Sequence, residues 1–547
     1  MATTPPAVQE EWEVREGMFI SRSVAAMTHR QKMAVVLTLA LVAGMEFGHR
    51  ISVNVLLPDM QGNVAADSDQ ISWVVTLYNL GFLCSMALAA WMTRVLGPRR
   101  HVLLSIWIYL AGAIGCVLSA NSLGLLLASR LVMGFGGGTF LVRMVIVVGL
   151  LFPGKSRVAP LTWIFSILYT VAIFYPMAVG WVDDTFHWNY AFLVDVPFLV
   201  VGSILVWKYI PSEFMFRRDP NDPPDFKGAV LLLISLSCLQ AALSRGERDM
   251  WLDKPWITLA LTASVVCFVA FVWQDRRAEN WTPVLHLRML WRQDYLRNTF
   301  GVVLIVGAML GAGLYVLPQY LRFVQDFSAT QVGAFISAYA LGIAASAFLC
   351  VRVLLARLGA LATTALGLAL MLLTCTLLIY EWTPTTPSLV LGASIFMQGF
   401  SLGPILLGGS NLATGSAPMA DLNDVGTAYF FTRQIGNTLG VTIAAVMFDY
   451  RETFHSYWML GVSNRLDPNT QRTLAQYATI VHRNAGGAYN PSLGALQLFQ
   501  NQVVLQSRLL SYIDVYFGLA LTALAGLACI LIARPRRKPS VPNIHLC

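Results

Sequence analysis

Long apolar stretches separated by short polar segments make up most of this 547-residue chain. Each stretch is close to the roughly 20 residues that a helix needs to cross a hydrocarbon core about 30 Å thick. The stretches lack the alternation expected of membrane barrel strands, so we predict helices, which satisfy their backbone groups internally. The predicted spans are residues 33–57, 71–92, 102–120, 124–149, 159–180, 190–210, 228–244, 256–273, 298–318, 331–351, 360–379, 388–409, 425–448 and 512–533. The pattern predicts an all-α polytopic membrane protein with 14 transmembrane helices.

The distribution of basic residues predicts the topology. The composition fits a membrane protein, since 56% of the residues are hydrophobic and 12% are charged. Of the 37 Lys and Arg residues, we place 24 on the side of the N-terminus, 9 on the opposite side and 4 inside spans. Because cytoplasmic loops carry the excess of Lys and Arg, we expect both termini in the cytoplasm and the protein in the inner membrane. The net charge of +8 then follows from topology, and no nucleic-acid partner is expected.

A short internal echo suggests that the chain contains two related halves. Arg94-Val95-Leu96-Gly97 follows the second span, and Arg357-Leu358-Gly359 follows the tenth. Membrane carriers are commonly built from such repeats. We therefore predict two six-helix bundles separated by two inserted helices. The predicted divisions are a cytoplasmic N-terminal segment 1–32, a first bundle 33–210, an inserted pair with cytoplasmic connectors 211–297, a second bundle 298–534 and a cytoplasmic tail 535–547.

Residues 449–511 form an unusually long segment on the predicted outer side, before the last span. It mixes polar residues with helical apolar patches, and connections of this length are usually functional or disordered. One interpretation is a soluble cap over the transport opening. The other is a docking surface for a periplasmic adaptor protein, which would lead to an outer-membrane channel. The sequence favours neither.

Few ionisable residues lie inside the spans, where a charge normally faces a cavity or a partner. On the first span, Glu46, His49, Arg50 and Asn54 share one helix face, because they are three, four and eight residues from Glu46. Counting about 1.5 Å per residue, Arg50, Arg130 and Asp195 lie at similar depth. The candidate proton-coupling residues are Glu46, His49, Arg130 and Asp195. The alternative is that Glu46–Arg50 and Asp195–Arg130 are fixed ion pairs that only hold helices in register.

Cations outnumber acidic residues inside the spans, which suggests a cavity that tolerates organic or fatty acids, since Arg binds carboxylates with two hydrogen bonds. Aromatic residues in the spans provide an apolar surface for the rest of such a molecule, although most residues of this kind face lipid or neighbouring helices. The candidate substrate-binding residues are Arg50, Asn54, Tyr78, Arg433 and Asn437.

Several segments carry a family resemblance when they are taken in order. They are Ile71-Ser72-Trp73 in the second span, Arg130 with Gly134 in the fourth, Pro176 with Gly180 in the fifth, His187-Trp188-Asn189 before the sixth and Arg433-Gln434-Ile435-Gly436 in the thirteenth. Together they resemble the major facilitator superfamily, and specifically its fourteen-span drug:proton antiporters of the EmrB type. The resemblance covers about residues 30–534. It implies the major facilitator fold and export coupled to the proton gradient, without a bound cofactor.

The resemblance also implies gating and packing residues, and it has departures. The implied residues are Arg94, Gly97, Arg99, Gly134, Pro176, Gly180 and Gly436. Small residues among them let helices approach closely and slide. The family's Asp in the first span is replaced by His49, its Asp after the second span by Thr93, and glycines of the fifth span by Tyr175 and Val179.

Other chemistries find little support in the chain. The eight cysteines form no CxxC pair, so neither a zinc site nor disulfides are expected. Residues 149–156 spell a Walker A motif, but they lie where the fourth span leaves the membrane, without a strand–loop–helix unit. No catalytic arrangement is evident, and we predict no enzyme. We predict a proton-coupled exporter of hydrophobic or amphipathic compounds (drugs, or organic and fatty acids), with membrane lipids as further partners and, if 449–511 is a docking surface, a periplasmic adaptor protein and its outer-membrane channel. The alternatives are an uptake carrier for a metabolite or siderophore, and a non-transporting membrane scaffold.

Overall fold

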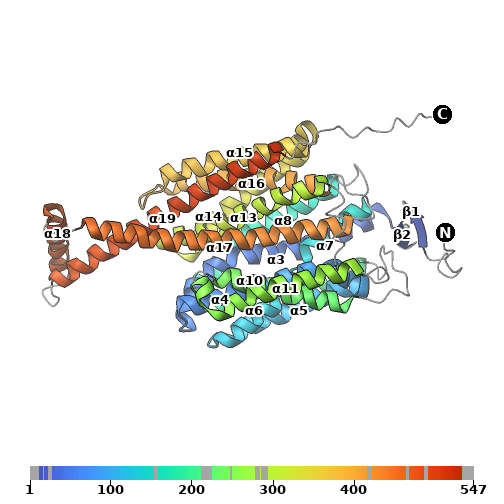
Figure 1. Ribbon diagram of the computed structural model, residues 1–547, viewed down its shortest axis with the longest axis horizontal. Coiled ribbons are helices and arrows are strands. Elements are labelled where there is room, and N and C mark those ends of the chain that lie inside the picture. The colour runs from blue at the N-terminus through green and yellow to red at the C-terminus, as the bar shows by residue number, and fades with distance from the viewer. Residues whose placement is uncertain are drawn as a thin grey trace.

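The computed structural model describes residues 12–15, 18–21, 27–152, 158–210, 225–246, 249–277, 284, 294–414, 422–463, 467–485 and 491–532. It is an elongated bundle of helices whose axes run mostly along its length (Figure 1). A short antiparallel hairpin, β1 (Trp12–Arg15) and β2 (Met18–Ser21), departs from the all-α prediction. This hairpin marks one end of the molecule, the N-terminal face, and α18 marks the opposite end, the α18 face.

The first half contains the helices of the predicted first bundle. They are α3 (His29–Asn63), α4 (Ser68–Leu96), α5 (Pro98–Leu118), α6 (Leu123–Gly137), α7 (Phe140–Leu151), α8 (Val158–Thr185), η2 (Trp188–Leu193) and α9 (Asp195–Tyr209). Capping boxes begin α3 at Thr28 and α4 at Asp67, which satisfies the first free amides of both helices. The predicted fourth span is divided into α6 and α7.

The second half contains α13 (Asp294–Phe323), α14 (Ala329–Leu349), η4 (Cys350–Leu354), α15 (Leu355–Glu381), α16 (Ser388–Thr414), α17 (Leu422–Val462), α18 (Pro468–Ala485) and α19 (Pro491–Ile532). The two glycines of the sequence echo have the same backbone conformation, with φ +80° at Gly97 and +77° at Gly359. Glycine adopts this region without the steric penalty of a side chain. In both halves the glycine therefore turns the chain sharply at the N-terminal face.

Helices α10 (Phe226–Arg245) and α11 (Pro255–Arg277) lie between the halves in sequence and pack on each other. Helix α10 also contacts α4 of the first half and α17 of the second. Thr438 on α17 donates a hydrogen bond to Gln240 at 2.8 Å, and Arg245 donates one to Ser72 on α4 at 2.9 Å. Most of the predicted connectors 211–227 and 274–297, and the tail 535–547, lie outside the described residues.

Eleven stretches of the described helices are long and apolar enough to cross a membrane. One of them, Ala329–Glu381, contains both α14 and α15. The chain is therefore a helical multi-pass membrane protein. The total of 14 spans stays a prediction.

The long segment 449–511 is helical over most of its described length. Helix α17 continues to Val462, α18 follows, and α19 begins at Pro491, so that these helices project beyond the rest of the bundle (Figure 1). Arg451 of α17 pairs with Asp514 of α19 at 2.5 Å, and Arg508 pairs with Glu452 at 2.9 Å. These pairs hold α17 and α19 together at the base of the projection.

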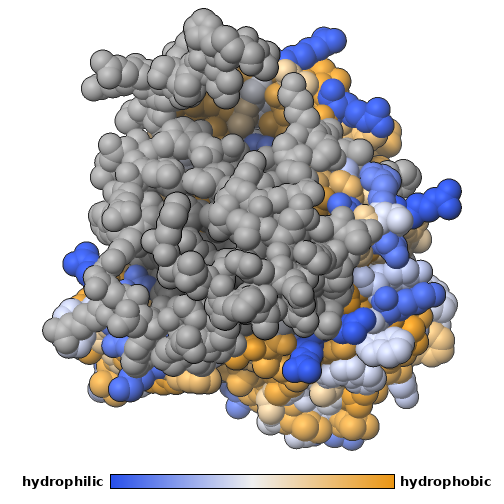
Figure 2. Space-filling model, turned by 90° about the vertical axis from the view of Figure 1, so that its right-hand side faces the viewer, coloured by the Kyte–Doolittle hydropathy of each residue, from blue (hydrophilic) through white to orange (hydrophobic). Residues whose placement is uncertain are grey.

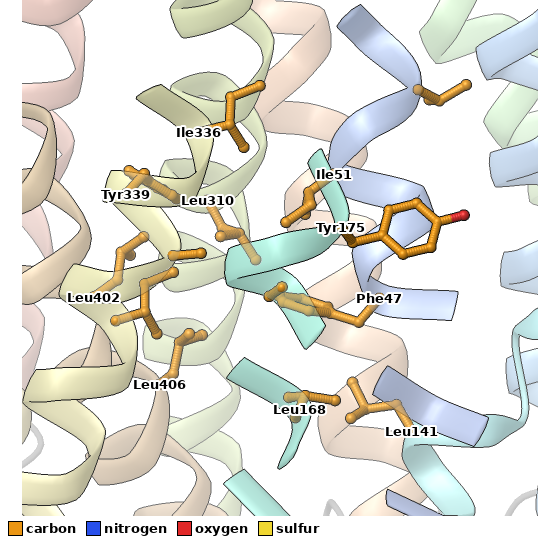
Figure 3. Packing of buried hydrophobic residues seen from close by; sticks show 14 of the residues in the cluster. Phe47, Ile51, Leu141, Leu168, Tyr175, Leu310, Ile336, Tyr339, Leu402 and Leu406 are labelled. Atoms are coloured by element: carbon orange, nitrogen blue, oxygen red, sulfur yellow. The ribbon is translucent and has the colours of Figure 1, made fainter. Parts of the chain in front are cut away.

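The two halves meet closely toward the α18 face. A Cβ on Gly180 of α8 would lie 2.5 Å from the carbonyl oxygen of Ala329, so the start of α14 can approach α8 only because no side chain is present. The opposite, N-terminal face exposes both hydrophilic and hydrophobic residues among those the structure describes (Figure 2). The apolar core continues between the halves, with Phe47, Ile51 and Leu310 pointing toward one another (Figure 3).

Candidate functional site

A buried chain of polar side chains crosses the first half. His49 on α3 lies between Arg130 on α6 and Asp195 at the start of α9. Nε2 of His49 is 2.9 Å from Nη1 of Arg130, and Nδ1 is 3.2 Å from Oδ2 of Asp195. Arg130 and Asp195 are fully buried and His49 is 2% exposed. The predicted direct pair Asp195–Arg130 is therefore replaced by a pair bridged through an imidazole.

The contacts determine which nitrogen of His49 carries the proton. A guanidinium has donors only, so Nε2 of His49 must accept from Arg130. The ring proton then resides on Nδ1, which lies 3.1 Å from the hydroxyl of Tyr175 and 3.2 Å from Oδ2 of Asp195. The hydroxyls of Tyr109 and Tyr175 also donate to Asp195, each at 2.8 Å. In this arrangement a neutral histidine joins one positive and one negative residue.

Glu46 forms a second group one turn before His49. Its Oε1 accepts a hydrogen bond from Tyr78 at 2.9 Å and lies 3.1 Å from Nε of Arg50. Its Oε2 is buried and has no hydrogen-bond partner among the described residues. The ring of Tyr78 also lies 4.2 Å below the guanidinium of Arg130, and so connects the two groups. When Glu46 and Asp195 are both ionised, their negative charges equal the positive charges of Arg50 and Arg130.

The four predicted proton-coupling residues thus lie together in one network. The predicted pair Glu46–Arg50 is present. The sequence did not single out Tyr109, and it marked Tyr175 only as a departure from a family glycine. A tyrosine within an apolar span is a weak signal of a buried polar network. Its hydroxyl normally needs a partner when buried, but the sequence does not show which residue that partner is.

A cavity lies between the two halves. Its walls come from α3, α7, α8, α13, α14, α16 and α17. Most lining side chains are apolar, including Phe47 and Ile51 of α3, Leu310 of α13 and Leu406 of α16 (Figure 3). Among the described residues of its lining, Arg433 of α17 is the only charged one.

Of the five predicted substrate-binding residues, Arg433 alone is in the lining of this cavity. Arg50 is held by Glu46, and its guanidinium lies 4.8 Å from the ring of Phe82. Tyr78 is buried against Glu46. The amide of Asn54 reaches the carbonyl of Leu314 across the two halves at 3.5 Å. Asn437 packs against glycines of α13, where its backbone leaves no room for a side chain.

The predicted gating residues mostly occupy close helix contacts. Gly134 lies against the backbone of Tyr78, and Gly436 lies against the backbone of Leu304. Arg99 donates to the carbonyl oxygens of Ile210 at 2.8 Å and Trp207 at 2.5 Å, which ties the start of α5 to the end of α9. The side chain of Arg94 lies outside the described residues. These positions have a packing role, and their gating role stays a prediction.

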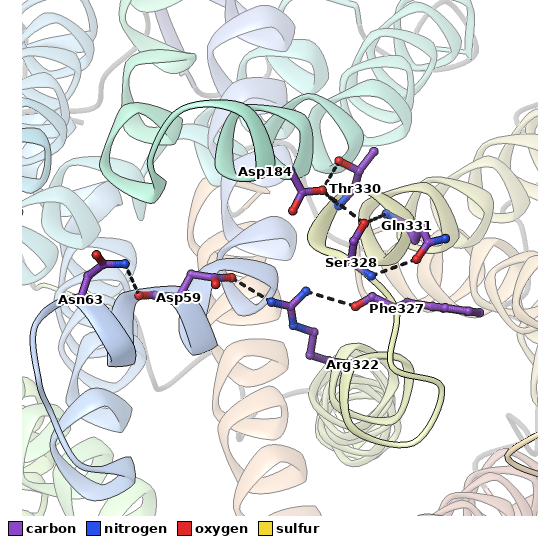
Figure 4. Close-up of polar contacts among 8 residues, drawn as sticks. All are labelled: Asp59, Asn63, Asp184, Arg322, Phe327, Ser328, Thr330 and Gln331. Carbon is purple, nitrogen blue, oxygen red and sulfur yellow. Dashed lines mark hydrogen bonds and ion pairs between the residues drawn. The ribbon is translucent and has the colours of Figure 1, made fainter. Parts of the chain in front are cut away.

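Polar contacts join the halves at the α18 face (Figure 4). Arg322 of α13 forms an ion pair with Asp59 of α3 at 3.2 Å. Asp184 of α8 accepts hydrogen bonds from the backbone and the side chain of Thr330, at 2.9 and 2.5 Å, in the first turn of α14. A carboxylate is favourable at a helix N-terminus, where backbone amides lack partners. The contacts of Arg322 with Asp59 and of Asp184 with Thr330 close this face, and neither contact was predicted from the sequence.

The fold and the cavity define a membrane carrier made of two helical halves around a central binding space. The sequence model of the Major Facilitator Superfamily matches residues 37–441. Because that match covers well over half of the chain, the protein belongs to the major facilitator superfamily. It is a transporter rather than an enzyme.

Similar proteins agree with this assignment. The multidrug export protein EmrB of Escherichia coli K12 is 24% identical over 459 residues, which cover 82% of this chain and 86% of EmrB. The multidrug resistance protein Stp of Mycobacterium tuberculosis H37Rv is 25% identical over 416 residues, covering 76% and 75%. These relatives confirm the resemblance predicted from the motifs.

Solved structures support the fold alone. A solved structure from work on proton dependent oligopeptide transporters has a TM-score of 0.58 to this chain at 16% sequence identity. The match covers 92% of this chain and 98% of the chain in that structure. A human organic anion transporter has a TM-score of 0.55 at 14% identity, covering 91% and 100%.

Proposed function

We propose that the protein is a secondary active exporter that moves hydrophobic and amphipathic compounds, drugs among them, out of the cytoplasm in exchange for protons. One observation carries this proposal: α3 serves both the cavity and the buried network. Phe47 and Ile51 face the cavity, whereas Glu46 and His49 take part in the network. A displacement of α3 therefore changes both at once. The relatives named as multidrug export proteins support the direction of transport.

The network couples proton binding to movement through charge balance. A buried charge that loses its partner is destabilised by several kcal/mol. When α3 moves, Glu46 stays beside Arg50 on the same helix but leaves the hydroxyl of Tyr78, and His49 leaves Arg130 and Asp195. A carboxylate that loses its partner on another helix becomes more stable with a proton, and the proton is displaced when the helices return. We assign proton coupling to Glu46 and His49, with Arg130 and Asp195 as the charges that tune them.

We place the N-terminal face in the cytoplasm and the α18 face in the periplasm, with the protein in the inner membrane. The excess of basic residues on the side of the N-terminus supports this orientation. We also infer the fourteen-span arrangement of two six-helix bundles, with α10 and α11 as the inserted pair. In this orientation the contacts at Arg322 and Asp184 close the periplasmic side, which suits loading of the cavity from the cytoplasm.

The projection formed by α17, α18 and α19 is either a soluble cap or a docking surface for a periplasmic adaptor and its outer-membrane channel. Exposed aromatic residues favour docking, since Tyr457 is 81% and Trp458 is 62% exposed on α17. Apolar side chains exposed together often mark contact surfaces. Co-purification from the native membrane distinguishes the two interpretations. It is carried out with the wild-type chain and with the chain that carries Tyr457→Ser and Trp458→Ser.

Flux in proteoliposomes tests the proposed function. Purified protein is reconstituted, the orientation is determined by protease access to the N-terminal segment, and the uptake of ethidium and of 1-pyrenesulfonate is followed by fluorescence. We expect uptake into inside-out vesicles to require an acidic lumen and to release luminal protons. Uptake that is unchanged after the proton gradient is collapsed contradicts the proposal, and so does transport of substrate in the same direction as protons.

A further inference from the structure

The cavity between the halves has two chemically different ends. Tyr169, Ser410, Tyr429 and Arg433 supply most of its polar groups, and Tyr339 supplies a further hydroxyl near Gly313. The hydroxyl of Tyr429 interacts with both Arg433 and Ser410, and it donates to the carbonyl oxygen of Leu406 at 3.3 Å. Because the proton of that hydroxyl is already used, its lone pairs face the guanidinium of Arg433.

The other end of the cavity is apolar. Ile51 of α3 and Leu310 and Leu314 of α13 line it. Leu314 is 20 residues from the start of α13, or about 30 Å along the helix, whereas Arg433 is 11 residues, or about 16 Å, from the start of α17. Both helices begin at the N-terminal face. The apolar end therefore lies deeper in the membrane than Arg433.

Arg433 carries a charge that no acidic partner among the described side chains neutralises. No acidic side chain among the described residues forms an ion pair with Arg433, whereas Arg50 on α3 is paired with Glu46. Its guanidinium lies 4.9 Å from the ring of Phe430 and 5.9 Å from that of Tyr429. These rings hold the guanidinium in place by cation–π attraction, Tyr429 also accepts a hydrogen bond from it, and Arg433 contributes to the cavity lining. An arginine at the wall of an apolar cavity is well suited to bind a planar or tetrahedral oxyanion through two hydrogen bonds.

We propose that Arg433 determines specificity for amphipathic anions, which bind with the acidic head at Arg433 and the apolar body toward Ile51 and Leu314. This inference rests on the proposed function and deepens it by naming the charge and orientation of the substrate. Tyr429 and Ser410 position the guanidinium. The head group lies toward the cytoplasmic side, and the apolar body contacts α3 directly beside Glu46 and His49.

A matched pair of probes tests the charge preference. 1-Pyrenesulfonate and (1-pyrenylmethyl)trimethylammonium share an aromatic body and carry opposite charges. In proteoliposomes with an imposed proton gradient, we expect wild-type protein to transport the sulfonate faster. Arg433→Gln should reduce sulfonate transport about tenfold or more, because a charge-assisted hydrogen-bond pair is lost. It should leave transport of the ammonium probe equal or faster, and Arg433→Lys should retain part of the sulfonate activity.

The controls separate failure of the inference from failure of the function. Arg352→Gln removes a positive charge that is absent from the cavity lining, and it should change neither probe. Leu314→Trp narrows the apolar end and should reduce transport of both pyrene probes while sparing a short anion such as benzenesulfonate. Gradient-driven transport of the ammonium probe alone, or equal sulfonate transport by Arg433→Gln and wild type, overturns the inference. Transport of neither probe by wild type counts against the proposed function itself.

Discussion

Gly333 on α14 lies so close to Pro176 on α8 that a Cβ on the glycine would overlap the proline's carbonyl oxygen. The overlap involves backbone, which cannot move aside as a flexible side chain could. Closure of the α18 face therefore depends on the absence of a side chain at position 333. The carrier cycle requires this contact to form and break.

Gly333→Ala should hold the α18 face open. We expect a thiol introduced by Leu314→Cys, in a chain without its eight native cysteines, to react several-fold faster with a membrane-impermeant maleimide added at that face. Gly392→Ala is the matched control, because a Cβ at Gly392 meets only the ring of Phe335 at an ordinary 3.6 Å. Equal reactivity of the two variants would show that the α8–α14 contact does not control access.

Closure of the α18 face should depend on external pH through Asp183, which lies beyond the predicted span 159–180. Burial and the neighbouring Asp59 and Asp184 raise the pKa of Asp183 from 3.8 to about 8, against the opposing effect of Arg322. A carboxyl whose pKa is higher in the closed than in the open structure favours closure while it is protonated. Closure should therefore be most favourable at low pH. As the pH rises from 3.8 to about 8, the equilibrium constant for closure should fall by up to tenfold per pH unit.

Maleimide labelling of Leu314→Cys at the α18 face across this pH range measures the effect. Asp183→Asn, which mimics the protonated acid, should keep the face closed and remove the pH dependence. His187 lies in the same region, where it is bonded to Asn63 and Asn189, and His187→Gln is the matched control that should leave the dependence intact. A pH dependence that survives Asp183→Asn would contradict its assignment to Asp183.

Tyr175→Phe should weaken the coupling of transport to protons without unfolding the protein. The substitution removes one of the two hydroxyl donors to Asp195 and leaves the ring in place. A lost hydrogen bond to a charged group corresponds to roughly 1.5–3 kcal/mol. We expect the ratio of protons released to substrate moved to fall, with the melting temperature little changed. An unaltered ratio would assign Tyr175 a packing role alone.

The sequence predicted the helices and the shared polar face of α3 well, because both depend on local periodicity. Glu46, His49 and Arg50 recur at helical spacing and do lie in one network. Depth counting also placed Arg130 and Asp195 near each other. It could not show that His49 lies between them, since the rotation of α6 and α9 about their own axes is set by packing with distant residues.

Contacts between helix ends could not be predicted from the sequence. Asp59, Asp184 and Arg322 are ordinary polar residues at the ends of spans, and only the packing of α3, α8 and α13 brings them together. Likewise, Arg433 was expected in the cavity with four other residues, yet those four are not in its lining. Apolar periodicity predicts which residues are buried, but it does not distinguish a helix contact from a cavity wall.

Proton release on substrate binding is the most direct measurement of whether the buried network on α3 couples transport to protons. Purified protein in weakly buffered detergent solution is mixed with 1-pyrenesulfonate while the pH is recorded. The account predicts that wild-type protein releases protons as the probe binds, and that Glu46→Gln binds the probe but releases fewer or none. Equal proton release by Glu46→Gln and wild type, at equal binding, would contradict the assignment of proton coupling to the buried network on α3.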